Sequence, residues 1–598
     1  MRKSKTTLLF LCALFFAISP MAIGQVNHLE KKISIDLKQV RLKNALPKIA
    51  ESGDFLFSYN SEIIPGDSLV SVQAENQPVN QVLKDLMGPG IRYKVLGNHV
   101  ILLNNQPEKR APKRESNPEY TITGYIYDAQ TGEIITSASI YEVEGMFVSA
   151  TDAKGYYSLT VPGDQEQKVL SYSKAGYIDT LIVVKPKETS SRNISLTPKP
   201  TKLNENQMQE VPMNGLNERT LVKALVPVKA RITAENIPVE EQRWAQLSLF
   251  PFIGSNRFVS GLITNRFSIN LFAGYAGGLK GIELGGFLNI VRKEMSGVQL
   301  SGFGNIVGNK SNGVQLSGFF NYDGGSFTGL QGTGFSNVVM DTVRGVQLAG
   351  FSNVLRGPMY GTQISGFSNF TSQNVDGLQA SGFANIALKD VKVAQLSGFG
   401  NFTSGANKGW QVAGFMNYAK ELRGVQIAPF NFADTASTGV PVGLFSYVAK
   451  GYHPLELTAN ELFPLNVTFK TGVSRFYNIF TAGIQRDLLT VGCGFGTQIK
   501  ISKVLGVSMD LTGNYLADNR NFLRSLGAHI RFAPTLDIRL AKHLTLLLGP
   551  TLNGFAGLDH ADAGTGDFPF IFSYPIKNLM IASTPVSIRL GATAGFRF

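Results

Sequence analysis

Few residues of this chain have the types and spacing that catalysis or metal binding requires. The six histidines are scattered, and none pairs with another at ligand spacing. The densest acidic group consists of Asp559, His560, Asp562 and Asp567. It could hold a cation, but its spacing departs from calcium-loop order, and a solvated loop between strands is favoured. Asp152 could also bind calcium, although a turn residue is the simpler interpretation. Because no nucleophile–base pair can be proposed, we expect no enzymatic activity, no catalytic or metal-binding residue and no cofactor.

The dominant pattern is a 16-residue repeat in which Gly-Phe-x-Asn recurs nine times without an insertion, from Phe287 to Phe415. An amide precedes each Phe by four residues, and Glu283 opens this series. The amides are Gln299, Gln315, Gln331, Gln347, Gln363, Gln379, Gln395 and Gln411. One unit is too short to fold alone, so neighbouring units must complete each other's cores. The Ser301 position changes to Thr333 and to Ala349 in other units, so its hydroxyl is no catalytic requirement.

Two constructions fit this repeat. In a β-solenoid each unit is one coil, and Gln, Phe and Asn stack into ladders along the axis. In a barrel each unit is one strand with a turn, and the amides face the lumen. Alternation along one unit predicts Val298 and Leu300 on one side, with Gln299, Ser301, Phe303 and Asn305 on the other. The invariant spacing favours the solenoid, because an insertion in a stacked coil disturbs its neighbours.

The carboxyl-terminal region has the alternation of a membrane β-barrel. From Val586 to Phe598 apolar residues alternate strictly with polar ones, as a lipid-facing strand around a polar lumen requires. Leu465–Lys470 repeats the pattern, and Cys493 falls on the apolar face of another such segment. The terminal Phe598 resembles the insertion signal of outer-membrane barrels. A soluble sandwich with one polar face is the alternative that the same alternation allows.

The first 24 residues resemble a secretory signal peptide, with Arg2, Lys3 and Lys5 before an apolar run and Ala22–Gly24 at its end. Without them the charge of +13 falls to about +10, and the surplus is spread out. A basic cluster in 109–114 belongs to a polar linker, so we expect no nucleic-acid partner. Cys493 is the one cysteine outside the predicted signal, which excludes an intrachain disulfide. No apolar run after residue 24 is long enough for a helix that spans a membrane, so any membrane insertion must use a β-barrel.

Two small modules precede the repeats. In 32–104, the strand Ile33–Leu37, two amphipathic helices around Leu46 and Leu83, and a hairpin at Gly97-Asn98 resemble the secretin and TonB short N-terminal domain. The resemblance implies a periplasmic domain that contacts a partner such as an anti-sigma regulator. In 119–198, Gly124–Asp128 and Thr151–Ser158 resemble the carboxypeptidase-regulatory-like β-sandwich, an immunoglobulin-like module without catalytic residues.

These segments predict a mainly β chain: a small α+β domain, an immunoglobulin-like sandwich, a 16-residue array and outer-membrane barrel strands. The predicted boundaries are 1–24 signal peptide, 32–104 first module, 105–118 linker, 119–198 sandwich, 199–242 connector, 243–280 barrel-like entry strands, 281–432 array and 433–598 barrel region. In the connector a helix near Leu221–Ala230 is interrupted by Pro227, and the absence of a plug domain argues against active transport.

The array itself resembles surface-repeat proteins of Gram-negative bacteria with G-V-Q-x-x-G-F-x-N units, a resemblance that brings no known activity. We therefore expect a non-enzymatic outer-membrane protein that contacts lipid, with its amino-terminal modules in the periplasm and a role in surface binding or signalling. The binding would use the amide-rich surface of the array. A pore or transporter component, with a lumen lined by Gln, Asn and Ser, is the alternative.

Overall fold

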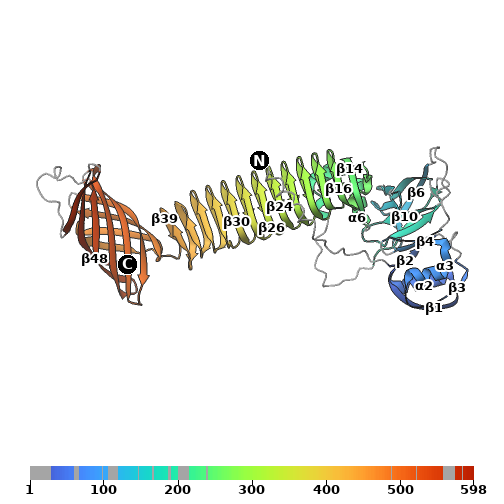
Figure 1. Ribbon diagram of the computed structural model, residues 1–598, viewed down its shortest axis with the longest axis horizontal. Helices are drawn as coiled ribbons and strands as arrows, with labels where there is room; N and C mark the ends of the chain where they lie inside the picture. The colour runs from blue at the N-terminus through green and yellow to red at the C-terminus, as the bar shows by residue number, and fades with distance from the viewer. Residues whose placement is uncertain are drawn as a thin grey trace, which may run out of the picture. The chain divides into compact units, whose positions relative to one another are not determined.

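The structure is a computed structural model (Figure 1), and the chain divides into two compact units. The described residues are 28–59, 66–96, 99–104, 119–145, 147–163, 167–185, 190–199, 214–237, 240–485, 488–519, 521–556, 573–581 and 584–598. The predicted signal peptide, the 105–118 linker, the Gly97-Asn98 turn and the acidic group at 559–567 lie outside them. The first unit comprises Met1–Met208, Val226–Gln242 and Asn256–Ile263, and the second comprises Gln209–Leu225, Arg243–Ser255 and Thr264–Phe598.

The amino-terminal module of the first unit is α+β, as predicted. Its elements are β1 (Lys32–Arg41), α2 (Leu42–Gly53), β2 (Leu56–Ser58), β3 (Leu69–Pro78), α3 (Val79–Met87), a 3₁₀ turn η1 (Gly88–Gly90), β4 (Ile91–Leu96) and β5 (His99–Asn104). β1 pairs with β3, and β5 lies between β2 and β4 in a second sheet. Helical spacing buries Leu42, Leu46 and Ile49 of α2 with Val82 and Leu83 of α3 in one core. The two helices therefore attach to the sheets through their predicted apolar faces.

The second module is a β-sandwich, again as predicted. It consists of β6 (Glu119–Asp128), β7 (Ser139–Glu142), β8 (Val148–Ala150), β9 (Tyr156–Pro162), β10 (Lys168–Ser173), β11 (Thr180–Val184), β12 (Ser190–Ser191) and β13 (Ile194–Leu196). One sheet has the order β11-β10-β7-β8, and the other places β6 among β12, β13 and β9. Between the sheets the hydroxyls of Tyr157 and Tyr172 are 3.0 Å apart, which satisfies both polar groups in an apolar core.

Short helices occupy the connector. α4 (Asn214–Asn217) and α5 (Thr220–Leu225) belong to the second unit, whereas α6 (Val228–Asn236) and the 3₁₀ helix η2 (Arg257–Leu262) belong to the first. Pro227 is the N-cap residue of α6, so the helix is interrupted where the sequence predicts. No helix in the described part of the chain is long and apolar enough to cross a membrane.

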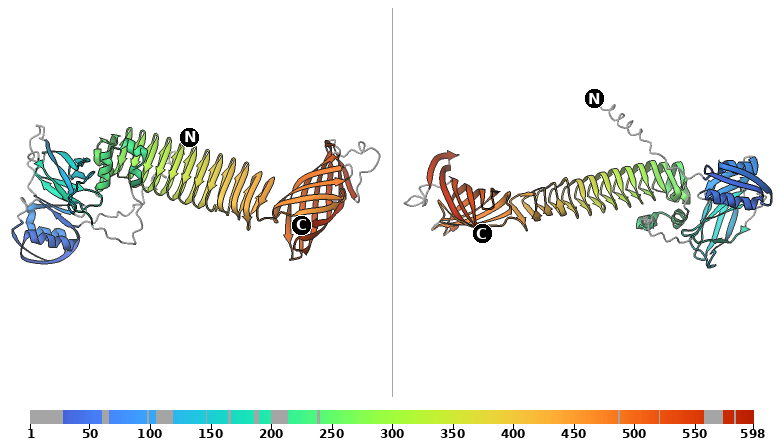
Figure 2. Two further views of the ribbon diagram at one scale, coloured as in Figure 1. Left: turned by 180° about the vertical axis from the view of Figure 1, so that it is seen from behind. Right: turned by 90° about the horizontal axis from the view of Figure 1, so that it is seen from below.

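The repeats form a β-solenoid, which confirms the favoured construction (Figure 2). Each coil contributes one strand to each of two parallel sheets, and equivalent residues of neighbouring coils pair in register, as Gln347 does with Gln363. The first sheet contains β14 (Glu241–Phe250), β15 (Ile253–Gly254), β16 (Ile263–Asn270), β18 (Gly278–Gly285), β20 (Met295–Ser301), β22 (Ser311–Ser317), β24 (Phe327–Thr333), β26 (Val343–Ala349), β28 (Met359–Ser365), β30 (Val375–Ser381), β32 (Ala394–Ser397), β34 (Trp410–Ala413), β36 (Val425–Ile427) and β38 (Val440–Val442).

The second sheet is built from shorter strands. It contains β17 (Ala273–Ala276), β19 (Leu288–Val291), β21 (Gly304–Val307), β23 (Phe320–Asp323), β25 (Ser336–Val339), β27 (Ser352–Leu355), β29 (Ser368–Thr371), β31 (Ala384–Ala387), β33 (Gly400–Asn407), β35 (Met416–Leu422), β37 (Phe430–Ala436) and β39 (Phe445–Val448). A turn at Gly-Phe joins a long strand to the short strand of the same coil, and a second turn leads to the next coil.

The solenoid is longer than the sequence repeat indicates. The alternation in Phe267–Phe272 and in Val440–Tyr447 underlies the barrel-like segments predicted at 243–280 and from 433, but these residues belong to β16 and the turn after it, and to β38 and β39, in the solenoid. The prediction that 243–280 contains barrel-like strands is therefore wrong, and so is the prediction that the barrel region begins at residue 433. Pairing shortens to 14 residues between Asn417 and Asn431, so a fixed 16-residue period cannot detect the last coils.

A closed eight-stranded barrel follows. Its strands are β40 (Leu455–Asn460), β41 (Leu465–Val473), β42 (Phe476–Gln485), β43 (Leu488–Lys500), β44 (Leu505–Asp518), β45 (Asn521–Ala541), β46 (Leu544–Ala556) and β48 (Thr584–Arg597), and β47 (Tyr574–Ile581) pairs with β48 outside the closed ring. Antiparallel pairing of β40 with β48 closes it, with Glu456 opposite Arg597. Closure leaves no unpaired edge in the ring.

Candidate functional site

Two amide ladders fill the interior of the solenoid. Gln363 donates from Nε2 to Gln347 Oε1 over 2.7 Å and accepts from Gln379 Nε2 over 2.9 Å. Asn353 donates in the same way to Asn369 over 2.9 Å, and also to the Ile364 carbonyl. All eight predicted glutamines, from Gln299 to Gln411, are fully buried in this ladder. They form a continuous internal hydrogen-bond chain and cannot be the binding surface that we expected from the sequence.

Apolar and hydroxyl side chains complete the core beside the ladders. Val343, Leu355 and Met359 pack in one cluster with Phe327 and Val391. A coil therefore turns four side chains inward, and only two of them are amides. Each repeat glutamine donates to the preceding coil and each repeat asparagine donates to the following one, as Gln363 and Asn353 do. Asn407 Oδ1 and Gln426 Oε1, outside these two sets, are buried without a hydrogen-bond partner among the described residues.

Two carboxyl groups interrupt the neutral interior. Glu283 accepts hydrogen bonds from Gln299 and Asn270, each over 2.8 Å, and its carboxylate ends the glutamine ladder at the first coil. Asp323 accepts from Ser311 and from Gln331. Burial raises the pKa of Glu283, and burial raises the pKa of Asp323 to about 7, in each case against the opposing effect of these hydrogen bonds.

The phenylalanines of the repeat stack outside the coil, which corrects the prediction that Phe303 shares a face with Gln299. Rings of neighbouring coils from Phe287 to Phe399 lie 4.6–5.1 Å apart with interplanar angles of 1–6°. Phe351 is 41% exposed and Phe367 42%. The Gly-Phe turn reverses the chain between the two sheets, so a two-residue alternation does not continue across it.

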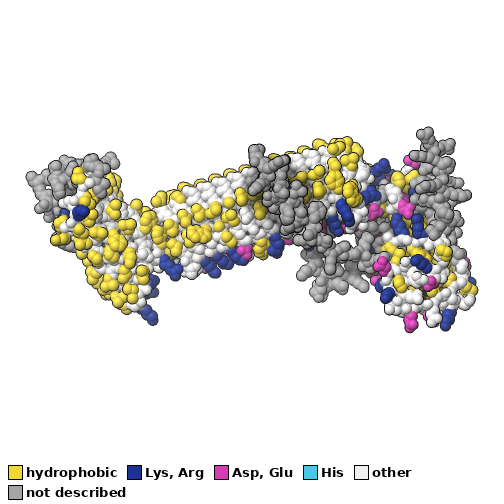
Figure 3. Space-filling view, viewed as in Figure 1, with side chains coloured by type: hydrophobic (Ala, Val, Ile, Leu, Met, Phe, Trp, Pro, Cys, Tyr) yellow, Lys and Arg dark blue, Asp and Glu magenta, His cyan; other side chains and the backbone are white. Residues whose placement is uncertain are grey.

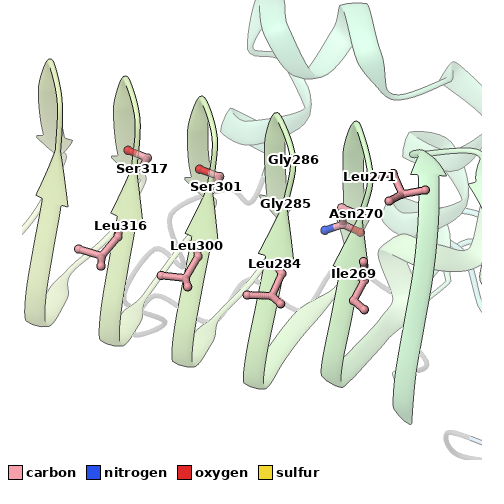
Figure 4. A pocket seen from close by; sticks show the side chains of 10 residues that line it. All are labelled: Ile269, Asn270, Leu271, Leu284, Gly285, Gly286, Leu300, Ser301, Leu316 and Ser317. Atoms are coloured by element: carbon pink, nitrogen blue, oxygen red, sulfur yellow. The ribbon is translucent and has the colours of Figure 1, made fainter.

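Apolar residues flank this Phe row on both sheets. Leu316, Leu348, Ile364 and Leu396 form one exposed row on the long strands. Val338, Phe370 and Ile386 form another, partly exposed row on the short strands. At the first coils the long-strand face is hollowed into an open groove of about 480 Å³, and Figure 4 shows Leu284, Leu300 and Leu316 in one line along it.

Charged residues gather at the opposite edge of the coils. Apart from the buried Glu283 and Asp323, every charged residue of 281–450 lies in or next to the turn between coils. The basic ones are Arg292, Lys293, Lys310, Arg344, Arg356, Lys389, Lys392, Lys408, Lys420, Arg423 and Lys450, against six acidic ones. Figure 3 shows the Lys and Arg side chains along one edge of the solenoid and the hydrophobic ones over its face. We call these the basic edge and the apolar face.

The barrel has a charged interior. Lys470 Nζ lies 2.8 Å from Glu456 Oε1 and 2.7 Å from Asp510 Oδ2. Arg597 bridges Glu456 at 2.6 Å and Asp537 at 2.7 Å. A cavity of about 30 Å³ lies next to these groups. The ion pairs cross the lumen and connect β40, β41, β44, β45 and β48.

The outside of the barrel is apolar. Leu465, Val467 and Phe469 of β41 are 38–47% exposed, whereas Asn466, Thr468 and Lys470 between them are at most 8% exposed. In β48, Leu590 and Phe596 point outward, and Phe598 after this strand is 53% exposed. Cys493 is also exposed, on the same apolar surface as predicted.

The described residues that the sequence offered as candidate ligands have structural partners. Asp152 accepts backbone hydrogen bonds from Lys154 and Tyr156, which is the role of a turn residue. Among the described residues no group of three or more His, Cys, Asp or Glu could hold a metal ion. Sequence reasoning missed the ion network of the barrel, although charged residues at inward positions of alternating strands, such as Lys470 and Arg597, were its signal.

Comparison of the chain with protein-family models, with curated proteins and with solved structures gave no match.

Proposed function

We propose that this protein is a non-enzymatic component of the outer membrane, which its barrel anchors in lipid while its solenoid and amino-terminal modules bind other parts of the envelope. The observation that carries the proposal is the closed barrel with apolar side chains outside and ion pairs inside. Such a surface is stable in hydrocarbon and costly to expose to water.

The resemblances in the sequence support the rest of the proposal. A predicted signal peptide provides export, and the modules at 32–104 and 119–198 provide interaction domains in the periplasm. The first of them contacts a protein partner of the anti-sigma regulator type. The amide ladders take no part in binding, because they are buried.

Cell fractionation tests the anchoring. We expect the full chain in the outer-membrane fraction, extractable by detergent and not by carbonate or high salt, and with altered migration after heating. Replacing Leu465, Val467 and Phe469 together by Ser should abolish this behaviour, whereas the same changes at the exposed, non-barrel residues Leu56, Leu69 and Leu221 should not. Recovery of the unmodified chain as a soluble periplasmic protein would refute the proposal.

Planar-bilayer recording separates an anchor from a pore. With its lumen crossed by the ion pairs of Lys470 and Arg597, the barrel should leave the bilayer closed. A reproducible conductance of the purified chain would favour the alternative hypothesis that the barrel is a pore.

A further inference from the structure

The outer surface of the solenoid is apolar over a length that a soluble arm has no reason to expose. Eight stacking steps of 4.6–5.1 Å carry the exposed and partly exposed Phe row from Phe287 about 39 Å to Phe415. Apolar rows on both sheets run beside it. A contiguous patch of this size marks an interaction site on a folded protein.

The stacking geometry limits what the Phe row can bind. Neighbouring rings cover each other's faces at interplanar angles of 1–3° in the middle coils, so only ring edges reach the surface. A sugar or a cation needs an open ring face, which this row does not offer. Acyl chains need only apolar area, and they therefore fit the row.

The backbone of the Gly-Phe turn also tolerates hydrocarbon. Phe383 N donates to Phe367 O over 2.9 Å, and Phe399 N donates to Phe383 O over 2.9 Å. Each coil thus satisfies the Phe N–H and Phe carbonyl groups of its neighbours' turns. Lipid-exposed backbone must be hydrogen-bonded within the protein, and the Phe groups of this turn meet that requirement.

The basic edge completes an amphipathic cross-section. The width of the apolar face can be taken along one coil from Ala394 to Phe399. At about 3.3 Å per residue this segment spans at most about 16 Å. One leaflet of a bilayer's hydrocarbon core is about 15 Å thick, so the two lengths are close. Exposed Lys389 and Lys392 lie beyond the apolar rows, at the level where headgroups would be. Ten of the eleven basic side chains are exposed or partly exposed, with Arg292 buried, and against six acidic ones they make this edge complementary to anionic headgroups.

The apolar surface continues into the barrel. Phe445 of the last coil contacts Phe480 on the barrel wall, with ring centroids 6.0 Å apart. Asn478 of the same strand donates to the Gly443 carbonyl over 2.7 Å. The surface that holds the barrel in lipid and the apolar face of the solenoid are therefore contiguous.

We propose that the solenoid lies along the membrane with its Phe row and apolar face inserted into one leaflet and its basic edge at the anionic headgroups. The inference rests on the proposed function, because the barrel holds the solenoid at the bilayer. The occupant of the apolar face is thus lipid, and neither a second copy of the chain nor a soluble ligand.

The chain supplies one reporter for each region. Trp410 lies on the solenoid surface and is 53% exposed, and Cys493 lies on the barrel wall. Trp244 and Cys12 are the other Trp and the other Cys of the chain, so the full chain with Trp244→Phe and Cys12→Ser carries one of each. This chain is reconstituted in vesicles of phosphatidylcholine and phosphatidylglycerol with brominated or ordinary acyl chains, and an environment-sensitive dye is attached to Cys493.

The expected result is quenching of Trp410 by brominated acyl chains and its protection from aqueous iodide, together with an apolar emission of the Cys493 dye. If Cys493 is in lipid but iodide quenches Trp410, the inference fails and the barrel anchor stands. Protection of Trp410 from both quenchers means that protein covers the face, which also overturns the inference. A Cys493 dye in water overturns the proposed function itself.

Paired variants separate the two sides of the solenoid. The triple variant Leu348→Gln, Ile364→Gln and Leu396→Gln, at positions 39–43% exposed, should lose most of the brominated-lipid quenching of Trp410 and leave the Cys493 signal unchanged. The triple variant Arg356→Gln, Lys389→Gln and Lys420→Gln, at exposed basic residues, should keep that quenching but lose its increase with phosphatidylglycerol. Unchanged circular dichroism establishes that both variants fold. Equal quenching in both variants and the parent would overturn the inference.

Discussion

Gln331 donates a hydrogen bond from Nε2 to Asp323 Oδ2 over 2.6 Å, inside a solenoid whose neighbouring coils place an apolar side chain at the Asp323 position. Val307 and Val339 occupy that position in the coils on either side, and both are fully buried. The carboxyl group of Asp323 is thus an ionisable defect among neutral neighbours, and Glu283, the other buried carboxyl group of the ladder, lies outside residues 311–331.

This defect predicts a stability of the solenoid that depends on pH. Burial raises the pKa of Asp323 from 3.8 to about 7, so between these values the folded chain holds a proton that the unfolded chain has released. The contribution of Asp323 to the free energy of unfolding is therefore fully present below the unfolded pKa. It is lost as pH rises through 7, and the loss is about 4 kcal/mol at most. Hydrogen exchange of residues 311–331, corrected for intrinsic rates, should show less protection at pH 8 than at pH 5.

Substitutions at two carboxylates identify the source of that dependence. Asp323→Thr should flatten the pH profile, because Thr371 occupies the equivalent position and bonds to Gln363 over 3.1 Å. Asp341→Asn, in an exposed turn, should keep the profile of the parent. A pH dependence that survives in Asp323→Thr would contradict the assignment.

The glutamine ladder should be sensitive to one missing amide. Gln363→Leu removes the donor to Gln347 and the acceptor of Gln379, which leaves buried polar groups without these partners. We expect a loss of about 1–3 kcal/mol for each group left unsatisfied. Chemical unfolding measures it, and Gln373→Leu at an exposed turn position is the matched control. Equal stability of the two variants would show that the ladder contributes little.

Coil stacking should exclude a side chain at the glycine of the long strands. Gly361 has a φ of +131°, and an added Cβ would lie 2.1 Å from the Gly345 carbonyl oxygen. Gly361→Ala should therefore destabilise the solenoid by at least about 2 kcal/mol. Gly332→Ala is the control, since its Cβ would meet only the movable end of Leu316 and neighbouring coils carry Leu there. Thermal unfolding of both variants that gives the same midpoint would refute this reason for the glycine.

The barrel should depend on complete pairing of its interior charges. Lys470→Met leaves Asp510 without its lysine and Glu456 with Arg597 alone, and we expect a loss of about 3–5 kcal/mol. Adding Asp510→Asn should restore part of the lost stability, because the carboxylate that Lys470→Met leaves without its lysine is then removed. The temperature at which the barrel loses its folded electrophoretic migration is the measurement. Lys500→Met, at an exposed strand end, should leave it unchanged.

Much of the fold could be predicted from local patterns. Helical spacing located α2 and α3, and the alternation from Leu465 to Lys470 gave the correct inward and outward faces of β41. Invariant 16-residue spacing favoured stacked coils over barrel strands, and in-register pairing bears this out. These predictions hold because periodic burial is a property of a single strand, helix or repeat.

The candidate site could not be predicted in the same way. The amides were expected on a surface, but the turn at Gly302-Phe303 reverses the chain and changes which residues face inward. Gln299 is consequently inside and Phe303 outside, although they are four residues apart and strict alternation would place them on one face. Such turns decide which face of a strand lies inward, and hydrophobic periodicity does not encode the geometry of a turn.

The sequence by itself therefore determined the repeat, its coil length, and the polar and apolar faces of the barrel strands. Only the tertiary structure decided that the amides are buried, that the Phe rings form an exposed stack, and that Glu456 meets Arg597 across 141 positions of sequence. The reason is physical: local periodicity fixes how one element distributes its side chains, whereas closure of a coil or barrel determines which of those faces meet each other and which meet the surroundings.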